Sequence, residues 1–484
     1  MKRTFRFSLE TEPSTATYLI WAVFLLGAVV RVLGLGYQSL WIDEAVSVQS
    51  CQQGFMDVVL LKDPTPPLYY VCLYFWIKLF GNGLVAVRSL SAIFGSLTIF
   101  AIYGVATRLV NRKTGLLAAL LLAVSPINLY LSQMARTYSL LALLSAVSIY
   151  LYLKLLGEKK TRAVILYALC NVLLVYSHVF GWFVIIAQNL HFLWRYRLRA
   201  ITKERWWIYL QIIPAVLFLP WFYRYITQCD DHGWVASAQL LVEFSALGAH
   251  LTVGIEESSL SAIVILPVLA LLIIKRSRQG FLYVWLLVPI LLPLLVTLLV
   301  SPIFMARYIY YISIPATILF AQALLQLKWR RAATALALLV FTGCAIHQQT
   351  RLNNDPWDQV AAYIQQVREN DEPIVVIKFY ETRPLSYYYD RDAFNAPDHE
   401  DRLAQGGIFG VEGLDAVKQH AYPALLLITS RMGLEAEADE IEAFYADHYE
   451  TVSSKTFIIQ SGKKHGNSIT VRSLRRRGTT AVLQ

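Results

Sequence analysis

Charged residues are scarce in this chain of 484 residues. Asp, Glu, Lys and Arg make up 16% of the sequence, whereas hydrophobic residues make up 56%. Because soluble globular proteins carry about 25% charged and about 45–50% apolar residues, this composition argues against an ordinary cytosolic enzyme. The aromatic content of 13% excludes a disordered chain. The composition therefore indicates an integral membrane protein.

Motifs of soluble enzymes are also missing. The sequence has no Walker-type or Rossmann glycine pattern, so a soluble nucleotide donor has no obvious cradle. It has no His and Cys cluster with metal-ligand spacing, and we predict neither a metal site nor another cofactor. It also lacks the internal repeat of many secondary transporters.

Cysteine is rare as well, with five residues in the whole chain. Cys72, Cys170 and Cys344 lie in apolar runs and are interpreted as small hydrophobic residues. Cys51 and Cys229 would both be external in the topology described below, where a disulfide between them is an open alternative.

Long apolar runs are abundant instead. A hydrocarbon core of about 30 Å needs roughly 20 helical residues. We find about eleven such stretches, at residues 18–35, 89–107, 115–131, 138–156, 163–178, 179–194, 206–222, 260–274, 281–300, 309–327 and 332–347. One further run, Leu68–Phe80, has only about 13 residues, which is typical of an interfacial or re-entrant helix.

The distribution of positive charge predicts the orientation of these spans. If Leu68–Phe80 does not cross and the basic N-terminus is cytoplasmic, alternate loops carry the clustered Lys and Arg, at residues 108–113, 154–162, 195–205, 275–278 and 328–331. This arrangement obeys the positive-inside rule, which a crossing by Leu68–Phe80 would break. The first span has a basic flank and no small-x-small cleavage site, so we interpret it as an uncleaved signal anchor. The net charge of +10 then records orientation, and we predict no nucleic-acid partner.

The region after residue 350 has soluble character and, after an odd number of crossings, is external. Helical spacing is found in Trp357–Arg368 and Glu437–Tyr449, and Pro373–Phe379 and Ala421–Thr429 have the character of buried strands. Thr451–Gln460 and Ser468–Ser473 are typical of a closing hairpin. We therefore predict a polytopic α-helical membrane domain over residues 1–350, with external loops 36–88 and 223–259, and a small extracytoplasmic α/β domain over 351–484.

Charged residues at the external edge of the spans are candidates for function, because they are costly in a membrane. Asp43 and Glu44 are adjacent carboxylates just after the first span, and such groups suit general-base chemistry. An ordinary acidic loop is the alternative. The proline-rich turn after Asp63 gives a rigid entry into the short helix that begins with Leu68 and Tyr69, and it holds Lys62 and Asp63 near the first acidic pair.

Two arginines lie at the same edge, Arg136 beside Tyr138 and Arg307 beside Tyr308. A phosphate is the partner that best fits a guanidinium in such an apolar setting, although snorkelling to the surface is the alternative. His178 lies in another external turn and is either structural or part of the site. Arg31, near the outer end of the first span, is a weaker member of this group.

These residues resemble a known family. Arg31-x-x-x-Leu35-Gly36, Leu40-Trp41-x-Asp43-Glu44-Ala45, Pro66-Pro67-Leu68-Tyr69-Tyr70, Ala135-Arg136-x-Tyr138 and Arg307-Tyr308 resemble, in order, bacterial members of the dolichyl-phosphate-mannose protein mannosyltransferase superfamily. These are GT-C glycosyltransferases, and the lipid A aminoarabinose transferases are relatives. The resemblance covers roughly residues 15–330, and the C-terminal domain is a variable appendage in such proteins.

The resemblance implies an inverting glycosyltransferase of the bacterial inner membrane. Its donor would be a polyprenyl-phosphate sugar in contact with membrane lipids, and its acceptor a hydroxyl of a lipid, glycan or protein on the external face. Asp43 would be the base, Glu44 would orient the base or the acceptor, and Arg136 and Arg307 would hold the departing phosphate. Tyr69, Tyr138, His178 and Tyr308 are further substrate-site candidates.

The chain departs from the family pattern at Thr65, because relatives carry Lys or His immediately before Pro-Pro. Phosphate contact from this loop would then shift to Lys62. Asp63 would be a second acid or, alternatively, a ligand for a divalent cation. Two other functions stay open at this point: a non-catalytic flippase or transporter of lipid-linked sugars, and a glycan ligase that uses a diphosphate-linked donor.

Overall fold

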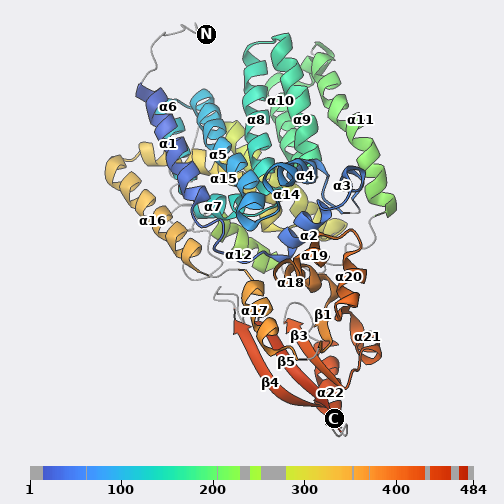
Figure 1. The fold of residues 1–484 in the computed structure, drawn as a ribbon. Helices are drawn as coiled ribbons and strands as arrows, with labels where there is room; N and C mark the ends of the chain where they lie inside the picture. Colours follow the sequence, from blue (N-terminus) through green and yellow to red (C-terminus); the bar gives the residue numbers. More distant parts are fainter. Residues whose placement is uncertain are drawn as a thin grey trace. The chain divides into compact units, whose positions relative to one another are not determined.

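The computed structural model describes residues 15–61, 63–203, 205–228, 240–251, 279–351, 354–369, 371–430, 437–458 and 468–477. The chain divides into two compact units (Figure 1). The first, which we call the helical unit, comprises residues 1–33, 62–69 and 88–348. The second, which we call the sheet unit, comprises residues 34–61, 70–87 and 349–484. The C-terminal region therefore forms one unit with two segments from the first 87 residues.

The helical unit consists of long apolar helices. The helices that lie wholly or mostly in it are α1 (Thr15–Val32), α5 (Leu84–Leu109), α6 (Arg112–Ala123), α7 (Pro126–Ser132), α8 (Tyr138–Gly157), α9 (Thr161–Ser177), α10 (Gly181–Lys203), α11 (Arg205–Gln228), α12 (Leu240–Leu251), α14 (Gly280–Leu299), the 3-10 helix η2 (Ala306–Ile312), α15 (Ser313–Leu325) and α16 (Arg330–Thr350).

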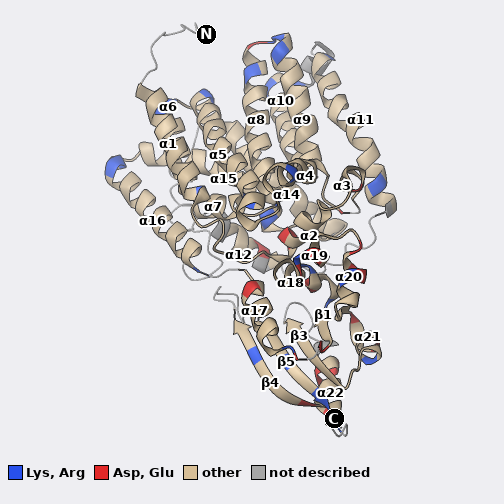
Figure 2. Ribbon diagram, viewed as in Figure 1, with Lys and Arg blue, Asp and Glu red and all other residues tan. Residues whose placement is uncertain are grey.

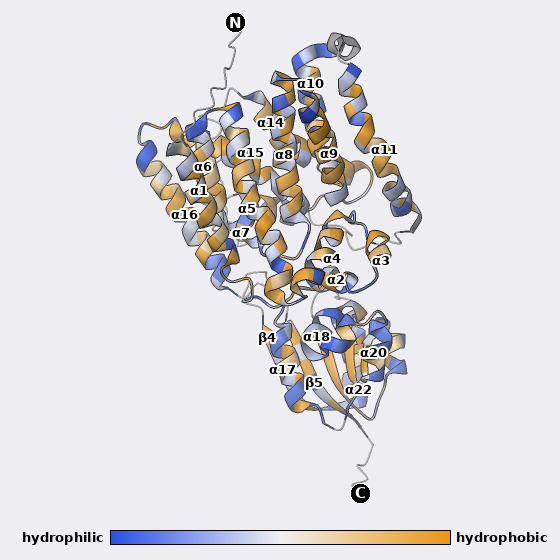
Figure 3. Cartoon of the chain, turned by 45° about the horizontal axis from the view of Figure 1, so that its top comes forward, coloured by the Kyte–Doolittle hydropathy of each residue, from blue (hydrophilic) through white to orange (hydrophobic). Residues whose placement is uncertain are grey.

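Seven helices among the described residues are long and apolar enough to cross a membrane, or eight if the bent pair α6–α7 counts as one span. Their outer faces are apolar: Leu25 on α1, Leu217 on α11 and Leu339 on α16 are all exposed. Hydrophobic residues also run along α9 and α11 in Figure 3. Lipid is the environment that suits such faces, and the chain is a multi-pass membrane protein.

The predicted spans correspond to helices wherever the structure describes them. The predicted crossing at 163–178 is the short helix α9, with 17 residues, and the one at 179–194 lies within α10. The predicted span at 260–274 lies outside the described residues. The total of eleven spans therefore stays a prediction.

One expected straight span, at 115–131, is broken. Helix α6 ends at Ala123, α7 begins at Pro126, and the two axes differ by 59°. Proline lacks the amide hydrogen that would continue the helix, and it disfavours the helical conformation in the residue before it. Ser125 is accordingly extended, with ψ 123°. At the break the amides of Val124 and Ser125 donate to the carbonyl oxygens of Leu120 and Leu122, each at 3.3 Å.

The short helix α4 has the predicted bounds, Leu68–Phe80. Its 13 residues span about 20 Å at 1.5 Å per residue, which is less than the thickness of a bilayer core. Lys and Arg gather at the ends of α8, α9 and α10 (Figure 2), where Lys159, Lys160 and Arg162 are exposed. The charge pattern that predicts orientation is thus present on the folded helices.

The sheet unit is an α/β arrangement. Its elements are α2 (Ile42–Ser50), α3 (Phe55–Val59), most of α4, α17 (Trp357–Val367), β1 (Ile374–Ile377), η3 (Phe379–Glu381), α18 (Thr382–Tyr389), α19 (Arg391–Asn395), α20 (His399–Gln405), β2 (Ile408–Val411), α21 (Gly413–Gln419), β3 (Ala424–Ser430), α22 (Glu437–His448), β4 (Tyr449–Ile458) and β5 (Ser468–Arg476).

The five strands form one sheet in the order β2-β1-β3-β5-β4. Strand β1 is parallel to β2 and β3, whereas β5 is antiparallel to β3 and β4. Alternate residues of β1 face opposite sides, as the two-residue period of a strand requires. Ile374 and Val376 pack with α17 and α18, and Val375 and Ile377 pack with α21 and α22. Both faces of the sheet are therefore covered by helices.

The structure confirms the predicted elements of this region. Strands β1 and β3, helices α17 and α22, and the pairing of β4 with β5 all lie where the sequence places them. The sequence did not predict β2, which contains Gly410. A Cβ atom at Gly410 would lie 2.7 Å from the Cα of Phe379, so this glycine permits the close approach of β2 to η3.

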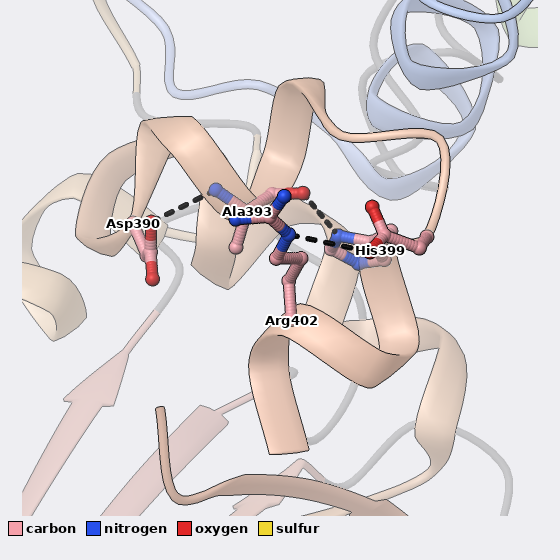
Figure 4. Close-up of polar contacts among 5 residues, drawn as sticks. Asp390, Ala393, His399 and Arg402 are labelled. Carbon is pink, nitrogen blue, oxygen red and sulfur yellow. Dashed lines mark hydrogen bonds and ion pairs between the residues drawn. The ribbon is translucent and has the colours of Figure 1, made fainter. Parts of the chain in front are cut away.

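The helices between β1 and β2 were also not predicted. They are short and are held by local polar contacts (Figure 4). The Asp390 carboxylate accepts from the Ala393 amide at 2.9 Å, and the His399 ring lies 3.0 Å from the Ala393 carbonyl oxygen. Helices of five to eight residues make too few turns for a hydrophobic period to stand out in the sequence.

The two early segments of the sheet unit change one expectation about cysteine. Cys51 is a free thiol whose sulfur donates to the Tyr70 carbonyl oxygen at 3.4 Å. Burial raises the pKa of this thiol. The disulfide considered for Cys51 is therefore not formed, and Cys229 lies outside the described residues.

Candidate functional site

Arg136 lies in the turn between α7 and α8, which hydrogen bonds hold at several points. The Arg136 amide donates to the Met134 carbonyl at 2.8 Å, and the Thr137 hydroxyl donates to the Ser177 carbonyl at 2.6 Å. The Gln133 side-chain amide donates to the carbonyl of Leu33 at 2.8 Å. This turn is therefore fixed to α1 and to the end of α9, which limits the positions open to the half-buried Arg136 side chain.

Tyr69 supports the same turn through a serine. Its hydroxyl lies 2.8 Å from the Ser91 hydroxyl, which in turn donates to the Arg136 carbonyl at 3.3 Å. Tyr69 is 1% exposed and Ser91 is fully buried. Tyr69, predicted as a substrate-site residue at headgroup depth, is thus a buried support for Arg136.

Arg307 lies in η2, which is held just as firmly. The Glu243 carboxylate of α12 accepts from the Ala306 amide at 2.7 Å. The Thr297 hydroxyl oxygen accepts from the amides of Ile303 and Phe304 at 3.0 and 2.8 Å. These contacts fix the segment that leads into η2 at the end of α14.

The two arginine segments meet around aromatic side chains. The Tyr310 hydroxyl of η2 donates to the Tyr138 carbonyl at 2.8 Å, and the rings of Tyr138 and Tyr308 are stacked with their centroids 6.4 Å apart. The His178 ring is 5.1 Å from the Tyr308 ring. The positive charges of Arg136 and Arg307 both act on the His178 imidazole.

We call this group, Arg136, Tyr138, His178, Arg307 and Tyr308, the arginine cluster. Five of the residues predicted to line a substrate site are therefore brought together in the helical unit. The His178 Nδ1 atom accepts from the Phe180 amide at 3.1 Å, which fixes the ring orientation. Two guanidinium groups on rigid segments can bind an oxyanion such as phosphate, because each offers donors in a fixed planar fork.

Asp43 and Glu44 lie in the sheet unit, in the first turn of α2. The Glu44 carboxylate accepts from the Trp41 amide at 3.2 Å, so it caps its own helix. Glu44 is 0% exposed, whereas Asp43 is half-buried. Glu44 thus has a structural task in α2, and Asp43 is the better placed of the two carboxylates to meet a substrate.

Asp63 also has a local task. Its carboxylate accepts from the Thr65 amide at 2.6 Å and forms a turn before α4. The structure does not describe Lys62. Within the described residues, no three His, Cys, Asp or Glu side chains gather as they would to hold a metal ion.

Arg31 is not a member of the arginine cluster. It is fully buried and donates to the carbonyls of Leu122 and Ala123 at 3.3 and 3.2 Å. These carbonyl groups lie at the end of α6, where the helix breaks before α7. A Cβ at Gly95 would come within 3.1 Å of the Arg31 Nε atom, so this glycine makes room for the guanidinium. Arg31 therefore stabilises the broken span.

Sequence reasoning overlooked two residues that support the cluster, Ser91 and Glu243. Ser91 is a small polar residue inside an apolar helix, and such serines usually bond to their own helix. Glu243 lies in the predicted external loop 223–259, in which the sequence singled out no residue. A carboxylate near the edge of an apolar run is the one signal that could have singled it out.

The fold matches solved structures of one class of membrane enzyme. ArnT from Cupriavidus metallidurans in the apo state aligns with a TM-score of 0.60 and 14% identity over 95% of this chain and 98% of that chain. The same protein bound to undecaprenyl phosphate aligns with a TM-score of 0.55, 14% identity and the same coverage. The Archaeoglobus fulgidus oligosaccharyltransferase complex with Zn and sulfate aligns with a TM-score of 0.53 and 12% identity over 77% of this chain and 61% of that chain.

The chain thus has the GT-C glycosyltransferase fold. The sequence model for dolichyl-phosphate-mannose-protein mannosyltransferase matches residues 64–223. This match lies within the region whose motifs resemble that family, and the fold agrees with the resemblance. No curated protein matches the chain in sequence. The matched range contains Arg136, Tyr138 and His178, whereas Asp43 and Arg307 lie outside it.

Proposed function

We propose that the protein transfers a sugar from a polyprenyl-phosphate donor to a hydroxyl of a lipid, glycan or protein, with inversion at the anomeric carbon. Asp43 takes the proton of the acceptor hydroxyl, whose oxygen attacks the anomeric carbon. The bond between that carbon and the phosphate oxygen breaks, and polyprenyl phosphate leaves with the electron pair. Arg136 and Arg307 stabilise the departing phosphate.

The observation that carries this proposal is the arginine cluster. Arg136 and Arg307 come from distant segments of an apolar helical bundle and both act electrostatically on His178, whose ring lies beside that of Tyr308. Hydrogen bonds fix the backbone of both arginine segments. Such a site suits an anionic group at the end of a lipid, because the charge can be neutralised while the tail stays among apolar helices. ArnT, which has this fold, has been crystallised with undecaprenyl phosphate.

The other substrate-site residues take supporting roles in this proposal. His178 and the tyrosines Tyr138 and Tyr308 line the phosphate site, and Lys62 contributes a further positive charge from the loop before α4. Glu44 holds the first turn of α2, which carries Asp43. Asp63 shapes the turn that leads to the short helix.

The proposal also includes an orientation. The protein lies in the bacterial inner membrane with its N-terminus in the cytoplasm and residues 351–484 outside, and catalysis takes place on the external face. An alkaline-phosphatase fusion after residue 350 should be active, and a fusion near Arg199 should be silent. The opposite pattern would reverse the sidedness of every loop.

The decisive experiment incubates the purified full-length protein with radiolabelled polyprenyl-phosphate hexoses and pentoses and an envelope extract as acceptor. A transferase releases free polyprenyl phosphate and labels the acceptor in inverted configuration, which NMR of the product measures. Movement of label across proteoliposomes without release of polyprenyl phosphate would identify a flippase. Preference for diphosphate-linked donors would identify a ligase. Either result would overturn the proposal.

A further inference from the structure

The region after residue 350 holds the segment that carries Asp43. Several hydrogen bonds connect the two within the sheet unit. The Leu40 amide donates to the Tyr388 hydroxyl at 2.7 Å, the Asn354 side-chain amide donates to the Ser39 carbonyl at 2.7 Å, and Arg383 Nε donates to the Gln49 side-chain oxygen at 2.8 Å. Leu40 and Ser39 both precede α2, and Gln49 lies near its C-terminal end.

Burial supports these contacts. Leu40, Ala45 and Val48 are 0% exposed. Helix α2 lies beside α18 (Figure 1), and residues of the two helices are in contact. Burial lowers the pKa of Arg383, as expected for a guanidinium removed from water. A partly buried arginine that loses its acceptor is destabilising, so the bond between Arg383 and Gln49 constrains both α18 and α2.

The turn between α4 and α5 is held by the same part of the chain. Arg391 donates to both the carbonyl and the side-chain oxygen of Asn82 at 2.9 Å. The Tyr387 hydroxyl donates to the Asn82 carbonyl at 3.0 Å, and the Asn82 side chain donates to Asn395 at 2.6 Å. Both early segments of the sheet unit therefore depend on α18 and α19.

Helix α2 has only nine residues. An isolated helix of this length is unstable in water, because too few hydrogen bonds offset the cost of nucleation. Its position must come from tertiary contacts, and α18 supplies the hydrogen bond from Arg383 to Gln49. Asp43 lies between the two attachment points at Leu40 and Gln49.

We propose that Tyr388 and Arg383 are positioning residues for Asp43, and that the C-terminal domain serves catalysis by fixing α2. This inference rests on the proposed function, in which Asp43 is the base. Neither residue contacts the substrate in this scheme; each fixes the helix from which the base approaches the acceptor. A small displacement of a catalytic group is expensive, because proton transfer requires hydrogen-bond distance.

The test compares Tyr388→Phe with Tyr389→Phe in the full-length protein. The first removes the oxygen that accepts from Leu40. The second removes a hydroxyl that accepts from Arg368 at 3.1 Å, a contact within the C-terminal region. We expect kcat to fall about tenfold in Tyr388→Phe with the donor KM unchanged, and to stay unchanged in Tyr389→Phe.

A second pair protects the test against misfolding. Arg383→Met removes the donor to Gln49 but keeps the aliphatic stem. Arg402→Met removes the exposed pair with Asp398, whose charged atoms lie 3.2 Å apart on the surface of α20. Melting temperature in detergent monitors folding of each variant. A loss of kcat in Arg383→Met, with Arg402→Met unaffected, would agree with the result for Tyr388.

A double mutant separates positioning from general stability. If Tyr388 acts through Asp43, Tyr388→Phe lowers kcat in the wild type but has no further effect in an Asp43→Asn background. An equal loss in both backgrounds would overturn the inference, as would wild-type kcat in both Tyr388→Phe and Arg383→Met while Asp43→Asn is inactive. Full transfer by Asp43→Asn would instead overturn the proposed base and the inference with it.

Discussion

The helical unit and the sheet unit hold their candidate residues in different ways. In the helical unit, Arg136 lies in the turn before α8 and Arg307 lies in η2, and hydrogen bonds within the unit fix both segments. In the sheet unit, Asp43 lies on a short helix that depends on residues more than 300 positions later in the chain, such as Tyr388.

In the proposed reaction, the helical unit binds the phosphate and the sheet unit positions the base. A phosphate site needs fixed positive charge in an apolar environment, which a helical bundle supplies. A base needs a defined position beside a polar acceptor, which a domain outside the bilayer can support. Perturbing each unit separately should therefore affect different kinetic parameters.

The largest effect is expected for the base. Asp43→Asn should lower transfer by about 10²–10⁴, because asparagine cannot accept the proton of the acceptor hydroxyl. Initial rates of acceptor labelling measure the loss. Asp57→Asn is the matched control, since the Asp57 carboxylate caps the exposed helix α3 through the Gly54 amide at 3.1 Å. Near-normal turnover in Asp43→Asn would remove Asp43 from the mechanism.

The next effect concerns the arginine cluster. Arg307→Met should lower kcat by about 10²–10³, since it removes a donor to the departing phosphate. Inhibition by free polyprenyl phosphate should weaken in parallel. Arg162→Met, at an exposed position near the start of α9, is the control. If Arg307→Met still bound polyprenyl phosphate as the wild type does, the cluster would not be the phosphate site.

A smaller effect is expected at Glu243. Glu243→Ala should leave the Ala306 amide without its acceptor and cost about 1–3 kcal/mol in stability of η2, with reduced transfer. Glu243→Gln keeps an oxygen acceptor and should retain most of the activity. Hydrogen exchange of residues 306–312 measures the loosening. Equal behaviour of the two variants would show that the carboxylate does not support Arg307.

The smallest effect concerns pH and the sheet unit. Burial raises the pKa of Glu381 to about 8. Between about pH 4.5, the usual pKa of a glutamate, and pH 8, Glu381 keeps its proton in the folded state but loses it in the unfolded state. The free energy of unfolding therefore decreases as the pH rises through this range. Glu381→Gln should flatten that decline. Melting curves recorded between pH 6 and 8 measure this decline, and each kcal/mol of stability should shift the melting temperature by about 2–4 °C.

Much of the fold could be predicted because its signals are local. The bounds of α4, the helices of the apolar runs and the strands β1 and β3 follow from runs of hydrophobic residues. The break at Pro126 was missed because the apolar pattern continues across it. Strand β2 was missed because four residues with a glycine carry little periodic signal.

Candidate site residues could be named from the sequence because charge is rare among membrane helices, and each rare charge is conspicuous. The sequence could not predict which groups these residues contact in the folded protein. Arg31 is grouped with Arg136 in the sequence, as the weaker candidate, and the structure shows that it bonds to the end of α6. Tyr69 looks like an interfacial residue, yet its hydroxyl contacts Ser91.

The sequence by itself determined that the chain is a multi-pass membrane protein with a small α/β region, because hydropathy and charge are properties of each segment alone. The electrostatic effect of Arg136 and Arg307 on His178 and the hydrogen bond between α18 and α2 are visible only in the folded protein. A side chain's partner depends on packing between segments far apart in the chain, and neither residue of such a pair carries a mark of the other.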